Sequence, residues 1–319
     1  MPNPAVSRTF PAMPLHPECR PLPGGFQLDA YRIDRMLSKG GFSLVYLATD
    51  GEGTPVVIKE YLPANLAGRQ GDDPAPTVAP ENQAKFRKGM RSFLEEARLL
   101  ARISHPNVVA VLNFFMTNNT AYIVMRHESG QSLHDYVSRL KGRGEAIAEA
   151  FVRGVFVRLL AGLREVHRQK LLHLDLKPAN IYLRSDGNPV LLDFGAARWG
   201  LGEGDPSLGQ VFTPGFAAPE QQGSGEALGP WTDIYAIGAT LYSCLDGGQT
   251  PMPARLRQEQ DGLERAEDRW ASRYSPQLLE VIDWCLRLPA TTRPQSVYAL
   301  QKVLNGELLD IVDPSWFDT

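Results

Sequence analysis

The stretch "LLHLDLKPANIYL" gathers a carboxylate, an ammonium and an amide in a few positions: Asp175, Lys177 and Asn180. In an extended backbone His173 would share a face with Asp175 and Lys177, the pattern of a half-buried strand. Pro178 would break such a strand at once, so a loop that presents these groups is the better interpretation. A proton acceptor, a cation and a neutral oxygen ligand are the groups that phosphoryl transfer needs.

A second carboxylate, Asp193, opens the sequence "DFG" and follows a turn at residues 186–188. The turn predicts that a strand gives way at Asp193 to a glycine-containing loop, although an aspartate that merely ends a hairpin would give the same pattern. Asn180 and Asp193 together offer the oxygen ligands that Mg²⁺ prefers, in a number that leaves room for water and phosphate.

Two features nearer the N-terminus could hold a phosphate chain. Gly40 and Gly41 lie between two β-type runs, where the absence of Cβ atoms lets backbone N–H groups approach phosphate; an ordinary hairpin turn has the same composition. Lys59 ends the run "VVIK", and Glu96 lies in the helical pattern that follows. This pair could fix phosphate oxygens, or it could be a surface ion pair worth only ~0–1 kcal/mol.

The elements that must position these groups begin with β-type runs rich in Val, Ile, Tyr and Phe. They cover residues 31–37, 44–49, 56–62, 108–115 and 121–127 and predict a small sheet. One amphipathic helix interrupts them at residues 84–103, and apolar side chains at three- and four-residue spacing predict its buried face. These side chains are Phe86, Met90, Phe93, Leu94, Ala97 and Ala101. The Gly/Pro-rich residues 68–80 predict a surface loop.

Helices dominate the chain beyond residue 126. The first spans residues 150–168, with Phe151, Val155, Leu159, Leu163 and Val166 along one face. Further helices are predicted at about 232–245, 276–287 and 297–305, the last ended by Gly306. The sequence therefore predicts an α+β protein with a β-rich part followed by a helical part.

Composition narrows the function classes. The chain has 319 residues with 43% hydrophobic content, enough for a sizeable core, and its net charge of -3 gives no basic field for nucleic acid or an anionic membrane. Its three cysteines never form C-x-x-C, which argues against a disulfide framework and fits a reducing cytosol. No apolar run is long enough for a membrane span. We therefore expect a cytoplasmic protein.

The ordered set "GGFSLVY", "VVIK", Glu96, "HLDLKPAN", "DFG" and "TPGFAAPE" resembles the eukaryotic-type (Hanks-type) serine/threonine protein kinases over about residues 30–306. "IKEYLPA" and "RPQSVYAL" look most like soluble bacterial members. The resemblance implies a bilobal protein kinase fold at 26–306, with a small β-rich N-lobe containing one helix to about residue 125 and a larger, mostly helical C-lobe from about 126. Proline-dense residues 1–25 predict an irregular, solvated tail or a docking arm.

The resemblance also implies a role for each residue of the nucleotide site. Gly40 and Gly41 would cover the ATP phosphates, Lys59 would contact the α- and β-phosphates, and Glu96 would hold Lys59. Leu37, Val45 and Met125 would line the nucleotide pocket, with Met125 beside the adenine. ATP and Mg²⁺, with Mn²⁺ as a possible substitute, are the implied cofactors.

The same resemblance implies roles in the catalytic part. Asp175 would be the catalytic base, Lys177 the contact to the γ-phosphate, and Asn180 with Asp193 the magnesium ligands. Lys177 and Thr213 occupy positions that resemble those of the family's serine/threonine-specific members, so the resemblance implies that Ser and Thr are the acceptors. The implied partners are protein substrates with Ser or Thr acceptors and an antagonist phosphatase.

Three structural residues also match the family pattern. Asp233 would brace the catalytic loop, and Glu220 with Arg293 would form a buried ion pair.

The tail from residue 307 could dock a partner through Trp316 and Phe317, or it could pack on the helical lobe.

Two departures from the family pattern bear on function. Ser38 and Ser43 occupy the outer positions of the usual three-glycine loop, which predicts a stiffer loop that still binds ATP. Leu174 occupies the position where an arginine usually precedes the catalytic aspartate. The chain therefore has no positive charge there that a phosphorylated activation loop would pair with. We therefore expect no requirement for phosphorylation of Ser207, although simple packing would also explain the leucine.

Two other functions compete with a protein kinase. A small-molecule phosphotransferase shares the Asp and Asn of the loop but normally lacks the "APE" segment and the partner of Arg293, and both are present here. A pseudokinase that acts as an ATP-binding scaffold is the alternative from a different class. Ser38 and Ser43 are its only support.

Overall fold

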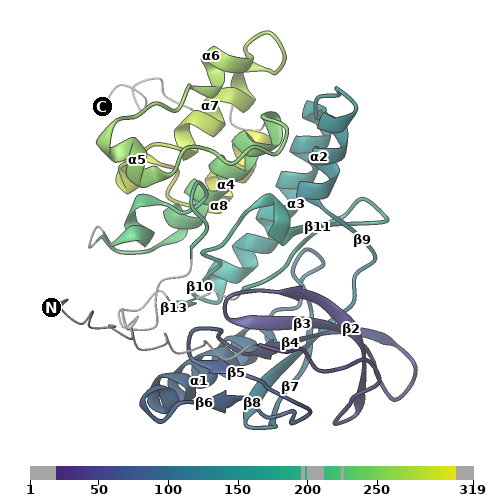
Figure 1. Ribbon diagram of the computed structural model, residues 1–319. Helices are drawn as coiled ribbons and strands as arrows, with labels where there is room; N and C mark the ends of the chain where they lie inside the picture. The colour runs from purple at the N-terminus through teal and green to yellow at the C-terminus, as the bar shows by residue number, and fades with distance from the viewer. Residues whose placement is uncertain (1–18, 195–197, 200–211, 224–225, 307–319) are drawn as a thin grey trace, which may run out of the picture. The chain divides into compact units, whose positions relative to one another are not determined.

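The computed structural model describes residues 19–194, 198, 199, 212–223 and 226–306, and the chain divides into two compact units (Figure 1). Unit 1 comprises the described residues up to Arg91 together with Phe115–Ile123. Unit 2 comprises Ser92–Phe114 and the described residues from Val124 onward. The helix α1 (Gln83–Leu100) and the strands β7 (Val111–Thr117) and β8 (Thr120–Arg126) run from one unit into the other.

A six-stranded sheet forms the frame of unit 1, in the order β1-β2-β3-β4-β8-β7. Its first strands are β1 (Gln27–Leu28), β2 (Tyr31–Lys39), β3 (Ser43–Thr49) and β4 (Pro55–Tyr61). The two-residue period of a strand is clear in β3, where every second side chain from Leu44 to Ala48 is buried. Each predicted β-type run contains a strand, although β7 begins at Val111, three residues later than predicted.

The predicted amphipathic helix is α1, with Phe86, Phe93 and Ala97 buried and Met90 and Leu94 half-buried. The prediction for its end was wrong. The helix ends at Leu100, and Ala101, predicted to be buried, is exposed in the turn that follows.

Two segments of unit 1 that were predicted to be irregular or on the surface are largely exposed, but single side chains in each are buried. Within residues 68–80 the chain pairs β5 (Ala67–Gly68) with β6 (Thr77–Val78) before the short 3-10 helix η1 (Pro80–Asn82), and Arg69 is buried. Of the proline-dense residues 1–25, Cys19 and Leu22 are buried, and Cys19 forms an isolated bridge with Arg69. Residues 1–18 lie outside the described part of the chain.

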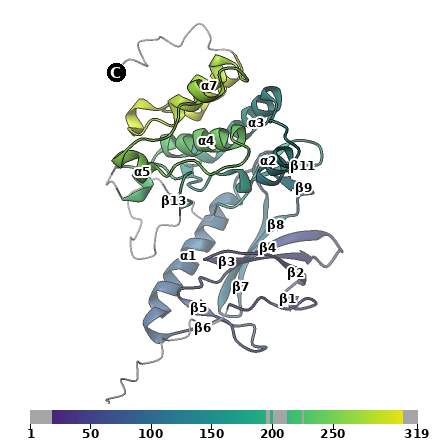
Figure 2. The same ribbon diagram turned by 45° about the horizontal axis from the view of Figure 1, so that its top comes forward.

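In the described part of unit 2, seven α-helices surround one apolar core. They are α2 (Leu133–Gly142), α3 (Glu149–Arg168), α4 (Pro230–Leu245), α5 (Ala254–Glu259), α6 (Ala266–Trp270), α7 (Pro276–Cys285) and α8 (Val297–Leu304). In α4 all residues from Thr232 to Leu245 are buried, as expected for a helix that is packed on every side. Figure 2 shows α4 beside α7, and α3 packs against α8. Among the helices of the described residues, none has the length and apolarity required to cross a membrane.

Short strands in unit 2 hold the loops that carry the candidate chemistry. They are β9 (Gly130–Ser132), β10 (Leu171–Leu172), β11 (Ile181–Arg184), β12 (Pro189–Leu191) and β13 (Arg198–Trp199). β11 and β12 form a hairpin, and at its turn the Asn188 N–H donates to Asp186 Oδ1 over 2.8 Å. The predicted turn at 186–188 is therefore confirmed. The hairpin places the residues before Ile181 beside those after Leu191.

Candidate active site

The backbone after β10 is a loop, so the half-buried strand considered for this stretch is wrong and the loop interpretation is confirmed. Leu174 adopts φ +62°, a left-handed conformation that a leucine rarely takes. The carboxylate of Asp233 holds this bend, because the N–H groups of His173 and Leu174 donate to its two oxygens over 2.9 and 2.8 Å. The predicted bracing role of Asp233 thus corresponds to two backbone hydrogen bonds.

Asp233 lies in the first turn of α4 and is completely buried. Burial would raise its pKa, but the hydrogen bond and charge of His167, with the contacts from His173, lower the pKa below the ordinary value. The Nε2 of His167 donates to Asp233 Oδ2 over 2.7 Å. The carboxylate is therefore charged and has hydrogen-bond donors on both oxygens.

Asp175 lies at the centre of a cluster of polar side chains. Lys177 Nζ donates to Asp175 Oδ2 and to Thr213 Oγ1, each over 2.7 Å. Thr213 Oγ1 in turn donates to Asp175 Oδ1 over 2.7 Å. Asn180 Nδ2 donates to Asp175 Oδ2 over 2.9 Å and to its backbone oxygen over 2.8 Å. The loop therefore brings the predicted base, cation and amide together around one carboxylate that is 14% exposed.

Asn180 and Asp193 become neighbours through the β11–β12 hairpin. The N–H of Leu192 donates to the backbone oxygen of Asn180 over 2.9 Å, and Asp193 is the next residue, with φ +54° and an exposed side chain. Because Nδ2 of Asn180 is bonded to Asp175, its amide oxygen points away from those bonds. A neutral oxygen and a carboxylate on adjacent segments fit Mg²⁺.

Mg²⁺ in nucleotide sites usually keeps water and phosphate oxygens among its ligands, so two protein oxygens are enough to hold it. Among the described residues, no group of three or more His, Cys, Asp or Glu side chains could hold a metal ion.

His173 joins the two loops and had no predicted role. Its Nε2 donates to the backbone oxygen of Leu192 over 3.0 Å, and its Nδ1 accepts from the Asp175 N–H over 3.4 Å. Its ring lies 4.4 Å from that of Phe194, centroid to centroid. Complete burial lowers the pKa of His173 in spite of the nearby carboxylates. A neutral ring with its proton on Nε2 satisfies both hydrogen bonds.

In unit 1 the loop from Gly40 to Phe42 joins β2 to β3, so the expected hairpin is present. Gly40 N donates to Ser43 O over 2.9 Å, and Ala64 N donates to Gly41 O over the same distance. A Cβ added at Gly41 would meet nothing within 4 Å. The glycine tip is therefore open, while hydrogen bonds hold its base.

The other predicted nucleotide contacts are divided between the two units. In unit 1 Val45 lies directly opposite Lys59 in the β3–β4 ladder, Lys59 is buried, and Leu37 is 40% exposed. In unit 2 Glu96 lies on α1, and Met125 packs against the core. The pairing of Lys59 with Glu96 stays a prediction.

A second buried carboxylate, Glu60, was not predicted from the sequence. The hydroxyls of Tyr46 and Tyr122 donate to it over 2.7 and 2.9 Å, and Arg69 pairs with both of its oxygens. Glu60 follows Lys59 in β4, and alternation puts the two on opposite faces. A charged residue inside an otherwise apolar strand is the one feature of the sequence that could have indicated that Glu60 is buried. The Gly/Pro-rich stretch contains no such feature for Arg69.

The predicted buried ion pair of Glu220 and Arg293 is confirmed. Arg293 Nη1 lies 2.7 Å from Glu220 Oε1, and both side chains are 0% exposed. Arg293 also donates to the backbone oxygens of Arg287 and Leu288 over 2.6 and 2.7 Å. Ser207, Trp316 and Phe317 lie outside the described residues.

A β-rich unit, a helical unit and this loop chemistry define the α+β fold of protein kinases, and comparison with known proteins agrees. A sequence model described as the protein kinase domain matches residues 31–305. The chain belongs to the protein kinase family. Its fold resembles a solved structure titled "PpkA-294 apo form", with a TM-score of 0.77 and 36% sequence identity, covering 89% of this chain and 99% of that one.

Curated relatives include bacterial and animal enzymes. Serine/threonine-protein kinase PknA of Nostoc sp. is 31% identical over 85% of this chain and 47% of its own length. Serine/threonine-protein kinase B of Synechocystis sp. is 32% identical over 69% and 37%. Serine/threonine-protein kinase Nek2 of Homo sapiens is 33% identical over 68% and 50%. The chain thus spans half or less of the length of these relatives.

Proposed function

We propose that this chain is a serine/threonine protein kinase that transfers the γ-phosphoryl group of ATP to Ser and Thr hydroxyls of protein substrates. The arrangement around Asp175 carries the proposal. Its carboxylate already accepts a hydrogen bond from the hydroxyl of Thr213 over 2.7 Å, and Lys177 supplies a cation at the same distance from the other oxygen. These are the positions of a base for an acceptor hydroxyl and of a positive charge for the transferring group.

The remaining residues have roles in nucleotide binding in this proposal. Asn180 and Asp193 would hold Mg²⁺, for which Mn²⁺ could substitute, and such a metal would supply positive charge to the phosphates. Lys59, positioned by Glu96, contacts the α- and β-phosphates. The open tip at Gly40 and Gly41 covers the phosphate chain, and the adenine site is lined by Leu37, Val45 and Met125.

Phosphate transfer from labelled ATP with Mg²⁺, to the chain itself and to a generic basic protein, tests the proposal. We expect label on Ser or Thr and a loss of about 10²–10⁴-fold in Asp175→Asn, because the variant lacks the base. Asp268→Asn, an exposed acid on α6, is the matched control and should transfer normally. Binding of ATP without any transfer by the parent chain would contradict the proposal and favour the ATP-binding scaffold.

We further propose that activity does not require phosphorylation of Ser207. The side chain of Leu174 is 5% exposed, and its backbone oxygen accepts from Gln221 Nε2 over 2.8 Å. An apolar residue therefore occupies the position before the base, and its side chain offers no positive charge to a phosphorylated Ser207. Ser207→Ala should retain the transfer rate of the parent chain. A collapse of that rate, with an unchanged melting temperature, would contradict the idea.

The cellular setting is also proposed. The bacterial relatives favour a cytoplasmic signalling kinase whose protein substrates are dephosphorylated by a separate phosphatase. Mass spectrometry of Ser and Thr phosphorylation in cells with and without Asp175→Asn would test this setting. Identical phosphorylation in both would contradict it.

A further inference from the structure

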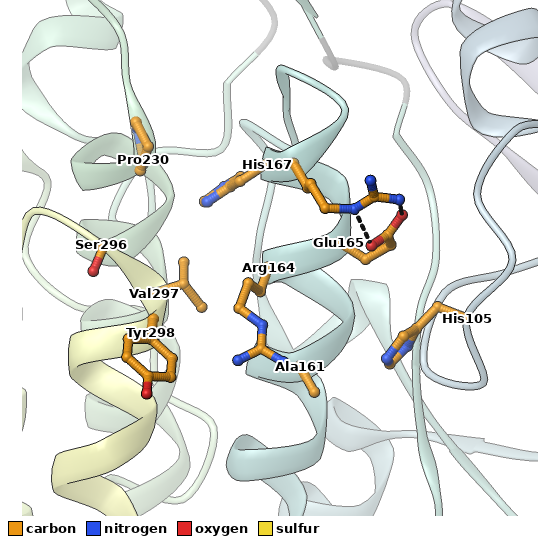
Figure 3. A pocket seen from close by; sticks show the side chains of 10 residues that line it. His105, Ala161, Arg164, Glu165, His167, Pro230, Ser296, Val297 and Tyr298 are labelled. Atoms are coloured by element: carbon orange, nitrogen blue, oxygen red, sulfur yellow. Dashed lines mark hydrogen bonds and ion pairs between the residues drawn. The ribbon is translucent and has the colours of Figure 1, made fainter.

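Unit 2 contains a pocket that the proposed kinase reaction does not use. Its volume is about 460 Å³, and it lies between the C-terminal half of α3, the first turns of α4 and α8, and His105. Figure 3 shows Val297 and Tyr298 of α8 facing Arg164 of α3, with His105 on the other side of α3. Ala161 and Val297 give the pocket an apolar wall.

Two arginines line this pocket, and Arg164 is the one without an ion pair to a carboxylate of the described residues. Its Cζ lies 5.7 Å from the centroid of the Tyr298 ring, and its Nη1 lies 3.5 Å from Gln301 Oε1. No carboxylate of the described residues forms an ion pair with Arg164. Its neighbour Arg168 differs, because it donates two hydrogen bonds to Glu165 over 2.7 and 2.6 Å.

The Glu165 carboxylate is therefore engaged with Arg168. The hydrogen bonds from Arg168 lower the pKa of Glu165 to about 2, so it stays charged. The pocket thus combines an available guanidinium, an apolar wall and the ring of Tyr298, which is 50% exposed. These features fit a ligand that carries both carboxylates and aromatic side chains.

Residues 307–319 of the same chain have this chemistry. They contain four acids, Glu307, Asp310, Asp313 and Asp318, no Lys or Arg, and the aromatic pair Trp316 and Phe317. They follow directly from α8, whose first turn lines the pocket. The eight residues of α8 span about 12 Å, whereas thirteen extended residues reach about 43 Å. The segment is therefore long enough to return to the pocket.

A second cation, Lys302, lies on α8 close to the pocket. Lys302 lies one turn after Tyr298, and its Nζ is 4.9 Å from the centroid of that ring. Tyr298 thus has a cation on a neighbouring helix, Arg164, and a cation on its own helix, Lys302, both close to its ring.

We propose that residues 307–319 dock in cis in this pocket, with acidic side chains on Arg164 and Lys302 and an aromatic side chain against Tyr298 and Val297. The docked segment is held by charge and by apolar burial together. Either contribution alone would be weak at an exposed site.

Two side chains that line the pocket are linked through hydrogen bonds to the two loops of the candidate active site. His167, which lines it, donates to Asp233, and Asp233 holds the bend at Leu174. His105 accepts from the Asn107 N–H over 3.1 Å, and the Asn107 backbone oxygen accepts from Leu191 N, two residues before Asp193. Docking therefore supports the catalytic loop, a consequence that rests on the proposed kinase function.

Hydrogen–deuterium exchange of the full chain tests docking independently of activity. We expect exchange in residues 307–319 to be at least about tenfold slower in the parent chain than in Arg164→Glu or in Trp316→Ala/Phe317→Ala. Peptides from α8 and the end of α3 should lose protection in the same variants. Arg158→Glu, an exposed arginine six residues earlier on α3, is the matched control. Its hydrogen bond goes to Asn188 and not to the pocket, so exchange in residues 307–319 should keep the parent pattern.

Three results would overturn the proposal. One is equal exchange of residues 307–319 in the parent chain and in Arg164→Glu. Another is protection lost on dilution, which would identify the occupant as the segment of a second copy. The third is a loss of protection in Arg158→Glu equal to that in Arg164→Glu, which would indicate a general charge effect.

A separate assay tests the consequence for catalysis. Arg164→Glu should transfer phosphate more slowly than Arg158→Glu at the same melting temperature. If exchange shows docking but neither variant nor parent transfers phosphate, the kinase proposal fails and the docking proposal stands.

Discussion

Two buried carboxylates, Glu60 in unit 1 and Asp233 in unit 2, are used differently. In unit 1 Glu60 accepts from two tyrosine hydroxyls and pairs with Arg69, so all of its partners are side chains. In unit 2 the oxygens of Asp233 accept from two backbone N–H groups and from His167. Glu60 therefore holds the surrounding structure together, whereas Asp233 fixes the conformation of one loop.

The partners of Glu60 explain how unit 1 holds two segments that have almost no regular structure. Arg69 also donates to the backbone oxygens of Arg20 and Pro74, over 2.9 and 2.8 Å. Tyr46 accepts from the N–H of Leu22 over 3.1 Å. One buried acid thus anchors residues 19–22 and the segment after β5. Loss of Glu60 should reduce stability, and loss of Asp233 should mainly reduce activity.

The largest effect is expected at the third buried acid, Glu220. Arg293→Ala leaves this carboxylate charged and buried with only the hydroxyl of Thr232 as a side-chain donor, 2.9 Å away. The free energy of unfolding should fall by about 3–5 kcal/mol, measured by urea denaturation. The double variant Glu220→Gln/Arg293→Met is the control and should lose less, because no buried charge remains. An unchanged melting temperature in Arg293→Ala would contradict the prediction.

A somewhat smaller effect is expected in Arg69→Ala. Glu60 keeps its two tyrosine donors, so we expect a loss of about 3 kcal/mol in the free energy of unfolding, at the lower end for a broken buried pair. Exchange protection of residues 19–22 should fall with it. Arg32, 62% exposed and 3.8 Å from Asp34, is the control, since Arg32→Ala should cost less than about 1 kcal/mol. Equal losses in the two variants would show that Glu60 does not anchor unit 1.

Asp233→Asn should separate activity from stability. The amide can accept only one of the two backbone hydrogen bonds, so the loop loses its fixed bend, and phosphate transfer should fall about 10²-fold. The cost in stability should be about 1–3 kcal/mol. Glu60→Gln is the comparison variant and should have the opposite balance. If both variants lose stability and activity in the same ratio, the proposed division of roles is wrong.

The sequence predicted the parts of this molecule that depend on local pattern. Strand alternation, helical spacing and the turn at 186–188 depend on neighbouring residues, and the corresponding elements were found. The loop around Asp175 was also predictable, because Pro178 excludes a continuous strand. Family resemblance supplied Asp233, Glu220 and Arg293, whose contacts the structure then showed.

The rest depends on contacts between residues far apart in the chain. Arg69 stands in a stretch whose composition indicates a surface loop, and its partner Glu60 belongs to a strand, so neither pattern predicts their pairing. Burial of Cys19 and Leu22 depends on the same network. The end of α1 was placed too late because Ala101 continues the apolar spacing, although the hydrogen-bonded helix has already ended at Leu100.

The smallest predicted effect concerns pH and again contrasts a buried group with an exposed one. Burial lowers the pKa of His173 below the ordinary value of 6.5. Below pH 6.5 the imidazole is therefore protonated in the unfolded chain more than in the folded chain, and the unfolded state is favoured. The stability that His173 contributes is complete above pH 6.5 and declines as pH falls. Urea unfolding from pH 7.5 to 5.5 should show this slope, and His173→Phe should flatten it. His134→Phe, at an exposed position on α2, should not; equal slopes in all three proteins would contradict the prediction.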